Sequence, residues 1–127
     1  MSSSSAATAS AAPLILVVED DAALREGLVQ LLRREGFQVE AAEHGEQALQ
    51  RFRQGLRPRL VLLDMMMPVM TGPDLLRHLE WEGLRGAVPV VALSALTQLP
   101  VELPVQGHLR KPPRLPELLA LARRLCS

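Results

Sequence analysis

Short apolar runs alternate with segments of helical periodicity along nearly the whole chain, and this alternation constrains the fold most. The runs Leu14–Val18 and Leu60–Asp64 are almost wholly apolar up to their last residue, which is typical of strands buried on both faces. The expected strands span residues 14–18, 37–42, 60–64, 88–93 and 105–109. Strands that alternate with helices predict a parallel sheet covered on both faces, with right-handed crossovers.

The intervening segments carry leucines and alanines at helical spacing, and most end at turn residues. The expected helices are residues 22–35, residues 45–54, a segment around Leu75 and Leu79 that ends near Gly83, and a last one from Leu115 to Leu125. Between the fourth and fifth strands, Pro100 and Pro104 interrupt the chain. Because a proline inside a helix costs about 3 kcal/mol, this crossover is expected to hold a short or degenerate helix, or a loop.

The chain of 127 residues has room for one domain, preceded by a Ser/Ala-rich stretch at residues 1–13. That stretch has neither a basic start nor an apolar core, so we expect a flexible tail or linker rather than a signal peptide or membrane span. The formal net charge is 0, so no overall field attracts nucleic acid or an anionic membrane. The lone cysteine, Cys126, has no partner in this chain for a disulfide, which fits a reducing cytoplasm.

Acidic residues follow two of the expected strands. Glu19, Asp20 and Asp21 come after the first strand, and Asp64 closes the third. Ligands of open parallel sheets bind at the carboxyl ends of strands, so neighbouring strands would bring these carboxylates together. One alternative is that residues 19–21 only cap the following helix. Asp64 favours a shared acidic site over helix capping alone, because a carboxylate at the end of a buried strand needs polar or charged partners.

Two further polar residues follow the last two strands. Ser94 comes after the fourth strand, and Lys111, the only lysine beside thirteen arginines, comes after the fifth. An ammonium can act as a point charge on a phosphate, and a hydroxyl can donate to a phosphoryl oxygen. Carboxylates with a hard cation such as Mg²⁺, together with Ser94 and Lys111, suit phosphoryl transfer onto Asp64.

Four motifs in this order resemble the receiver domains of two-component response regulators. The resemblance covers Leu14 to Leu125, and its motifs are LILVVEDD at 14–21, LVLLDMMMPVMTG at 60–72, VVALSA at 90–95 and HLRKP at 108–112. It implies a doubly wound, flavodoxin-like α/β fold with strand order 2-1-3-4-5, and makes residues 14–127 a receiver domain. It also implies a histidine kinase or histidine phosphotransfer protein as phosphoryl donor and an unidentified downstream protein as output partner.

The same resemblance assigns roles to individual residues. Asp64 would be the phosphoacceptor, and Asp20 and Asp64 would bind Mg²⁺ together with the backbone carbonyl of Met66. Glu19 would act on the metal through water. Ser94 and Lys111 would contact the phosphoryl group. Asp21 would serve the start of the following helix.

The chain departs from the family pattern at three places. The interval from Ser94 to Lys111 is short, and the position of the usual aromatic switch residue is His108. An imidazole there would serve with Ser94 as the switch, while an exposed histidine without that role is the alternative. Met66 and Leu96 occupy positions whose side chains influence dephosphorylation in the family. Neither can orient a water by hydrogen bonding, so we expect a slowly hydrolysing phosphoryl-aspartate.

Other interpretations remain open from the sequence. One is an interaction module that works without phosphorylation and keeps the acidic pocket as a relic. Another is a Mg²⁺-dependent phosphatase, against which Met66 stands where such enzymes carry a second aspartate. The leading hypothesis is a phosphoacceptor that signals through protein contacts and turns over no external substrate. The Met65–Met67 run and Trp81 are expected to pack within the fold; the alternatives are a soft docking surface for the methionines and an interface anchor for the tryptophan.

Overall fold

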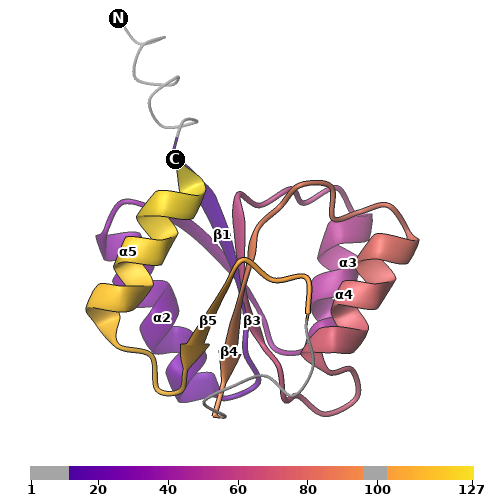
Figure 1. Ribbon diagram of the computed structural model, residues 1–127, viewed down its shortest axis with the longest axis horizontal. Helices are drawn as coiled ribbons and strands as arrows, with labels where there is room; N and C mark the ends of the chain where they lie inside the picture. The colour runs from indigo at the N-terminus through magenta and orange to yellow at the C-terminus, as the bar shows by residue number, and fades with distance from the viewer. Residues whose placement is uncertain (1–11, 96–102) are drawn as a thin grey trace, which may run out of the picture.

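The computed structural model describes residues 12–95 and 103–127, which form a three-layer α/β domain (Figure 1). Its strands are β1 (Leu14–Val18), β2 (Gln38–Ala42), β3 (Leu60–Asp64), β4 (Val90–Ser94) and β5 (Gly107–Arg110). Its helices are α2 (Ala22–Arg34), α3 (Gly45–Arg53), α4 (Gly72–Trp81) and α5 (Leu115–Cys126). Within the described ranges no helix combines the length and apolar character needed to cross a membrane.

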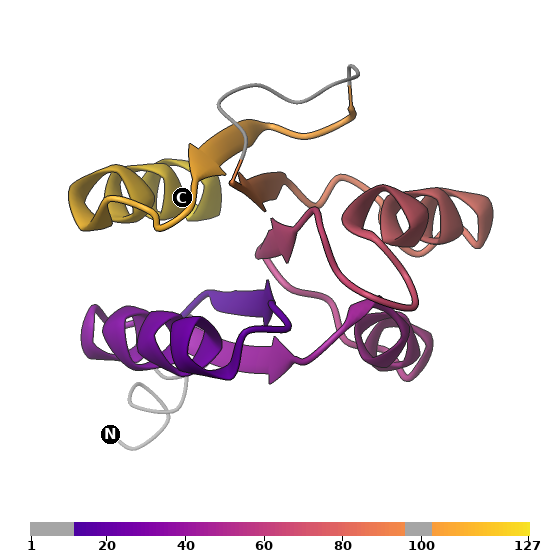
Figure 2. The ribbon, with the colours of Figure 1, turned by 90° about the horizontal axis from the view of Figure 1, so that it is seen from below.

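The five strands are all parallel and lie in the order β2-β1-β3-β4-β5. Helices α2 and α5 cover one face of the sheet, and α3 and α4 cover the other (Figure 2). This is the flavodoxin-like order that the family resemblance predicted, so the predicted fold class is confirmed. The order places β1 and β3 side by side, with their carboxyl ends at one edge.

Side chains of the central strands alternate between two apolar clusters. Val61 and Leu63 of β3 pack with residues of α3 and α4, whereas Leu60 and Leu62 pack with residues of α2 and α5. Every residue of β3 and β4 is buried. The central strands therefore lack the polar alternation of a half-exposed sheet, as their sequences predicted.

The last two strands begin two residues later than predicted. Gln106 explains the shift, because its side-chain Oε1 accepts a hydrogen bond from Val90 N at 2.8 Å, and its own N donates to Val90 O at 2.8 Å. The paired register then starts at Val91 and Gly107. Val88 lies outside the ladder, and its carbonyl accepts a bond from Arg85 Nε at 3.1 Å.

The connection between β4 and β5 is described only at residues 95 and 103–106, and these residues contain no helix. Leu103 and Val105 pack against the cluster under α3 and α4. The predicted short or degenerate helix falls mainly on residues 96–102, which lie outside the described part of the chain. Most of the predicted tail, residues 1–11, lies outside it as well.

Candidate functional site

Three acidic side chains meet at the carboxyl ends of β1 and β3. These strands are parallel neighbours with Val18 opposite Leu63, so the residues that follow leave the sheet at one edge. One carboxylate oxygen from each of Glu19, Asp20 and Asp64 lies within 4.8 Å of the other two. Glu19 and Asp64 have no exposed surface, and Asp20 is exposed. The cluster therefore has a buried floor and one solvent-facing member.

Lys111 joins this cluster from the end of β5. Its Nζ lies 3.0 Å from Glu19 Oε1 and 3.0 Å from Asp64 Oδ1. Its backbone N–H donates to Ser94 O at 2.8 Å, which ties the end of β5 to the end of β4. One ammonium thus bridges two buried carboxylates, and three acidic groups face a single positive charge.

Asp21 has a different role from its two acidic neighbours. Its side-chain Oδ1 accepts a hydrogen bond from Leu24 N at 3.1 Å and caps α2. Its backbone N–H donates to Glu19 Oε2 at 3.1 Å, and Arg25 Nη1 donates to Glu19 O at 2.9 Å. The helix-capping alternative therefore holds for Asp21, as predicted, whereas Glu19 and Asp20 face the cluster.

The acidic cluster perturbs its own proton equilibria. Burial raises the pKa of Glu19 to about 7, although the Asp21 N–H and the Lys111 ammonium oppose that rise. Burial, followed by the neighbouring Asp20, raises the pKa of Asp64, and the pKa of Asp20 is lowered by its interaction with Asp64. Burial disfavours the charged form of Lys111, but Asp64 and Glu19 together raise its pKa above the usual value. The cluster holds more negative charge than its one ammonium neutralises.

The residues present fit a hard divalent cation. The donors are carboxylate oxygens, which Mg²⁺ prefers, and Asp20 leaves one side open to solvent. Asp64 Oδ2 is buried and has no hydrogen-bond partner. A buried acceptor without a partner is costly, so this oxygen favours an added cation or donor. Glu19, Asp20 and Asp64 are the side chains that could hold one.

Ser94 and His108 lie beside this edge in different ways. Ser94 closes β4 next to β3 and is 1% exposed. His108 pairs with Ala92, and strand alternation places it on the α3 and α4 face, opposite Leu109. Its Nε2 is buried and has no hydrogen-bond partner. His108 is half-buried, so neither its switching role nor the alternative of an exposed histidine without that role is decided, and both stay predictions.

The loop after Asp64 folds back against the end of β3. Met66 N donates to Asp64 Oδ1 at 3.1 Å, and Gly72 N donates to Met65 O at 3.2 Å. A Cβ atom at Gly72 would lie 2.7 Å from Asp64 O, so no larger residue fits there without a shift. Thr71 and Asp74 then form a capping box that starts α4.

Sequence reasoning gave no role to Gly72 or to Arg25, although both support the acidic edge. The Thr-x-x-Asp pattern of the capping box was a readable signal for the start of α4. The contact of Arg25 with the Glu19 carbonyl had no such signal, because arginines are frequent in this chain.

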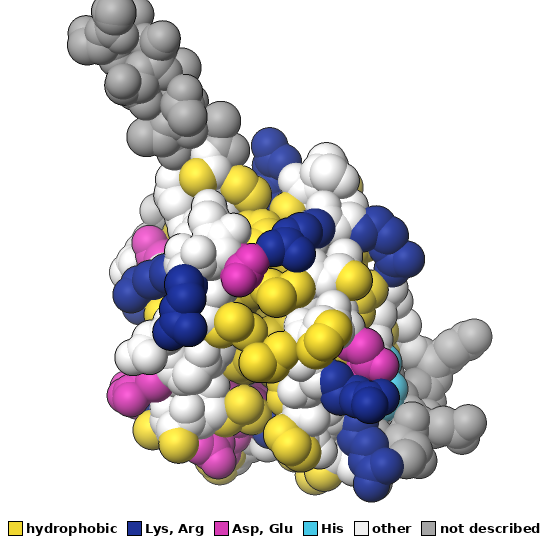
Figure 3. Space-filling view, turned by 90° about the vertical axis from the view of Figure 1, so that its left-hand side faces the viewer, with side chains coloured by type: hydrophobic (Ala, Val, Ile, Leu, Met, Phe, Trp, Pro, Cys, Tyr) yellow, Lys and Arg dark blue, Asp and Glu magenta, His cyan; other side chains and the backbone are white. Residues whose placement is uncertain are grey.

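The described residues form two apolar grooves outside the acidic cluster. One, of about 400 Å³, runs between α2 and the segment after Lys111 and is lined by Leu24, Leu28, Pro113 and Leu115 among others. Figure 3 shows apolar side chains gathered in a band on the molecular face that α2 and α5 form. This groove adjoins the loop that carries Lys111, so a partner seated in it would lie near the acidic edge.

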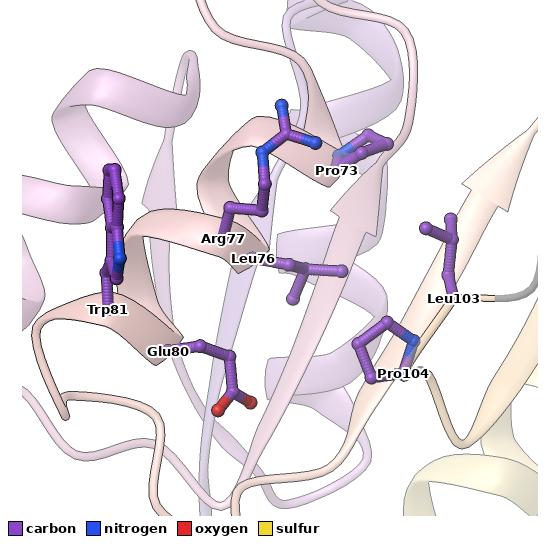
Figure 4. Close-up of a pocket in the computed structure, with 7 residues that line it drawn as sticks. All are labelled: Pro73, Leu76, Arg77, Glu80, Trp81, Leu103 and Pro104. Atoms are coloured by element: carbon purple, nitrogen blue, oxygen red, sulfur yellow. The ribbon is translucent and has the colours of Figure 1, made fainter.

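The second groove, of about 550 Å³, lies between α4 and Leu103–Pro104 (Figure 4). Trp81 lines its rim and is 85% exposed, so the prediction that it packs within the fold is wrong. Leu75, Leu76 and Leu79 form the buried side of α4, and the Trp81 and His78 rings form a T-shaped pair with centroids 6.3 Å apart. None of the acidic-cluster residues lines this groove.

Comparison with known proteins places these features in a family. A family model described as the response regulator receiver domain matches residues 15–123. DNA-binding response regulator MtrA of Mycolicibacterium paratuberculosis is 43% identical over 114 residues, which cover 86% of this chain and 49% of that protein. SphR of Synechococcus elongatus, an alkaline phosphatase synthesis transcriptional regulatory protein, is 37% identical over 87% of this chain and 48% of its own length. The chain spans about half the length of these curated relatives.

Solved structures agree with the sequence matches. The receiver domain of the hybrid histidine kinase CckA is 31% identical, with a TM-score of 0.76, and the match covers 90% of this chain and 99% of that one. The receiver domain of a sensor histidine kinase from Pseudomonas aeruginosa is 25% identical with a TM-score of 0.82, covering 91% of this chain and 98% of that one. That structure holds a magnesium ion in its active-site cleft. The chain described here belongs to the response regulator receiver domain family.

Proposed function

We propose that Asp64 accepts a phosphoryl group from a histidine kinase or a histidine phosphotransfer protein. The observation that carries this assignment is the environment of its two carboxylate oxygens. Oδ1 lies 3.0 Å from the Lys111 ammonium, whereas the buried Oδ2 has no hydrogen-bond partner. One oxygen is thus held by a cation, and the other is left for a new bond or a metal.

The transfer exchanges one bond for another. An oxygen of the ionised Asp64 carboxylate attacks the phosphorus of the donor's phosphohistidine, and an O–P bond forms as the N–P bond breaks. The electron pair of the broken bond stays on the donor imidazole. Lys111, already 3.0 Å from Asp64 Oδ1, offsets the negative charge that the phosphoryl oxygens bring to the pocket.

We propose Mg²⁺ as the cofactor of this pocket. Asp20, Asp64 and the backbone carbonyl of Met66 would bind the ion directly, and Glu19 would act through water. When bound, Mg²⁺ would offset the charge of the carboxylates and of the incoming phosphoryl oxygens. The unpartnered Asp64 Oδ2 and the crowding of three carboxylates support this assignment.

Ser94 and Lys111 are proposed to hold the phosphoryl oxygens and to start the outward signal. They are linked directly, because Lys111 N donates to Ser94 O at 2.8 Å. His108 lies on β5, the strand that ends just before Lys111, and is proposed as the second switch residue. Its buried Nε2 has no hydrogen-bond partner, so a rotation that brings it to a polar partner would be favourable. The thioether of Met66 is a poor acceptor for an attacking water, which supports a slowly hydrolysing phosphoryl-aspartate. Leu96, the other residue of that prediction, lies outside the described ranges.

Partners are proposed to be proteins on both sides of the exchange. The groove between α2 and Pro113 offers an apolar seat for the phosphoryl donor beside Lys111. The downstream partner is proposed to be a protein rather than nucleic acid or a membrane, because this domain carries a formal net charge of 0. A cytoplasmic location is proposed with it, in keeping with the unpaired Cys126.

A small-molecule phosphoryl donor tests the proposal without knowledge of the kinase. We expect acetyl phosphate with Mg²⁺ to add one phosphoryl group to the protein, detected by intact mass, and EDTA to prevent the addition. Asp64→Asn should abolish the addition, whereas the matched Asp74→Asn, at the start of α4, should retain it. Retained addition in Asp64→Asn would refute the assignment. Incubation with histidine kinases would then identify the donor.

The same experiment separates the other hypotheses. An interaction module that works without phosphorylation would show no addition. Its wild type and its Asp64→Asn variant would bind the partner equally well. A phosphatase would release phosphate from a phosphomonoester over many turnovers, and we propose that this protein does not. The family match supports signalling over turnover of an external substrate.

A further inference from the structure

The methionines that follow Asp64 differ sharply in exposure. Met65 and Met67 are 4% and 6% exposed, whereas Met66 between them is 68% exposed. The same residue touches the acceptor, because Met66 N lies 3.1 Å from Asp64 Oδ1. Its Cα is bonded to that nitrogen, so the flexible, solvent-facing thioether begins at the edge of the pocket.

The neighbouring methionines are held by packing. The methyl carbon of Met65 lies 2.7 Å from the position that a Cβ at Gly72 would occupy, and Met70 Cγ lies 2.9 Å from the equivalent position at Gly45. Both side chains therefore fill space that the first residues of α3 and α4, Gly45 and Gly72, leave open. An oxidant reaches the buried Met65 and Met67 only if the loop opens, whereas it reaches Met66 in the closed fold; Met70 is half-buried and lies between these extremes.

We propose that Met66 is a site of oxidation by peroxides that controls the lifetime of the phosphoryl group. The sulfur lone pair attacks one peroxide oxygen, an S–O bond forms and the O–O bond breaks. The departing hydroxide takes up the proton from the oxygen that is transferred, so the products are methionine sulfoxide and water. Thiol-dependent sulfoxide reductases reverse this change.

The lifetime effect rests on the proposed phosphorylation of Asp64. A thioether is a weak hydrogen-bond acceptor, whereas a sulfoxide oxygen is a strong one. Carried on three rotatable bonds beside Asp64, that oxygen accepts a hydrogen bond from a water and holds the water near the phosphorus. Hydrolysis of the phosphoryl-aspartate then accelerates, so oxidation of Met66 shortens the lifetime of the phosphorylated state.

The first measurement locates the oxidation. Native protein is exposed to a limited dose of hydrogen peroxide, and its peptides are analysed by mass spectrometry. The exposure difference predicts oxidation of Met66 at least about tenfold faster than of Met65 or Met67. Equal rates at the three residues would overturn Met66 as the site. Unfolding in urea should remove the difference, which shows that the fold protects the other two.

The second measurement times the loss of phosphate. Protein labelled with acetyl phosphate before and after peroxide treatment should lose its phosphoryl group at least about threefold faster when Met66 is oxidised. Treatment with a sulfoxide reductase should restore the slow rate, and Met66→Gln should lose phosphate quickly without peroxide. Met66→Leu should show no response to peroxide, while Met70→Leu should keep it.

The outcomes separate the two proposals. An unchanged lifetime after selective oxidation of Met66 would overturn the regulatory claim and leave phosphorylation intact. If neither oxidised nor reduced protein accepts phosphate at Asp64, the proposed function fails and the lifetime claim fails with it. The peptide analysis still decides which methionine is oxidised, because it needs no phosphorylation.

Discussion

Replacement of Glu19 by Gln should reduce a pH-dependent loss of stability in metal-free protein. Glu19 is wholly buried within the cluster, and burial raises its pKa from 4.5 to about 7. Gln has nearly the same shape and keeps an oxygen that can accept the hydrogen bond of Asp21 N. The substitution therefore removes the titration and leaves the packing and this contact in place.

The magnitude follows from the two pKa values. A carboxyl group whose pKa is higher in the folded state binds more protons when folded, so its stabilising contribution is lost as pH rises from the unfolded to the folded pKa. For Glu19 this window runs from 4.5 to about 7. At 1.36 kcal/mol per pKa unit, about 2–3 kcal/mol of stability should disappear between about pH 5 and about pH 8. Asp64, whose pKa is also raised, adds a loss of the same sign.

Urea unfolding in EDTA at these two pH values measures the effect. The free energy of unfolding of the wild type should fall more steeply with pH than that of Glu19→Gln, by about 2–3 kcal/mol. Saturating Mg²⁺ should restore the wild type at the higher pH, because a ligand that binds only the folded state stabilises it. Parallel pH profiles of the two proteins would refute the raised pKa and the buried charge behind it.

Three further substitutions test the geometry around the site. Val69 has a φ of 71°, which costs a β-branched residue about 1–2 kcal/mol, so Val69→Asn should raise the free energy of unfolding by about 1 kcal/mol; no gain would contradict that backbone conformation. Gly72→Ala should lower it by about 1–3 kcal/mol through collision with the Asp64 carbonyl, whereas the control Gly27→Ala in the open middle of α2 should raise it slightly; similar effects of the two would contradict the collision. Asp21→Ala should cost about 1 kcal/mol in thermal unfolding by removal of the α2 cap, and an unchanged melting temperature would argue against the cap.

Much of the fold could be predicted from local patterns. The strand bounds Leu14–Val18 and Leu60–Asp64 were predicted correctly, because continuous apolar runs that end on acidic residues mark where a buried strand leaves the core. The order of the strands came from the family resemblance, since alternation alone does not say which strands are neighbours. The start of α2 could be predicted at Asp21, because its side chain can accept a hydrogen bond from a free N–H group of the first helical turn.

The late starts of β4 and β5 were not readable. Val88 and Val105 have the composition of strand residues, but their places are decided by Gln106, which pairs with Val90 through both its side chain and its backbone. The strand propensity of single residues has less influence on where a strand begins than such a long-range hydrogen bond. Trp81 shows the same limit, because helical periodicity leaves an exposed position open to any residue that solvent tolerates.

The residues of the acidic edge and their places at strand ends follow from the amino-acid sequence alone, since a parallel sheet brings the carboxyl ends of its strands to one side. Tertiary packing decides which of those residues contact one another and which are exposed to solvent. Lys111 reaches Glu19 across 92 positions of the chain, and that contact depends on where β5 comes to rest. Packing of the loop after Asp64 likewise buries Met65 and Met67 and leaves Met66 in solvent. Three identical side chains in a row carry no local signal for that difference, because only the surrounding fold distinguishes them.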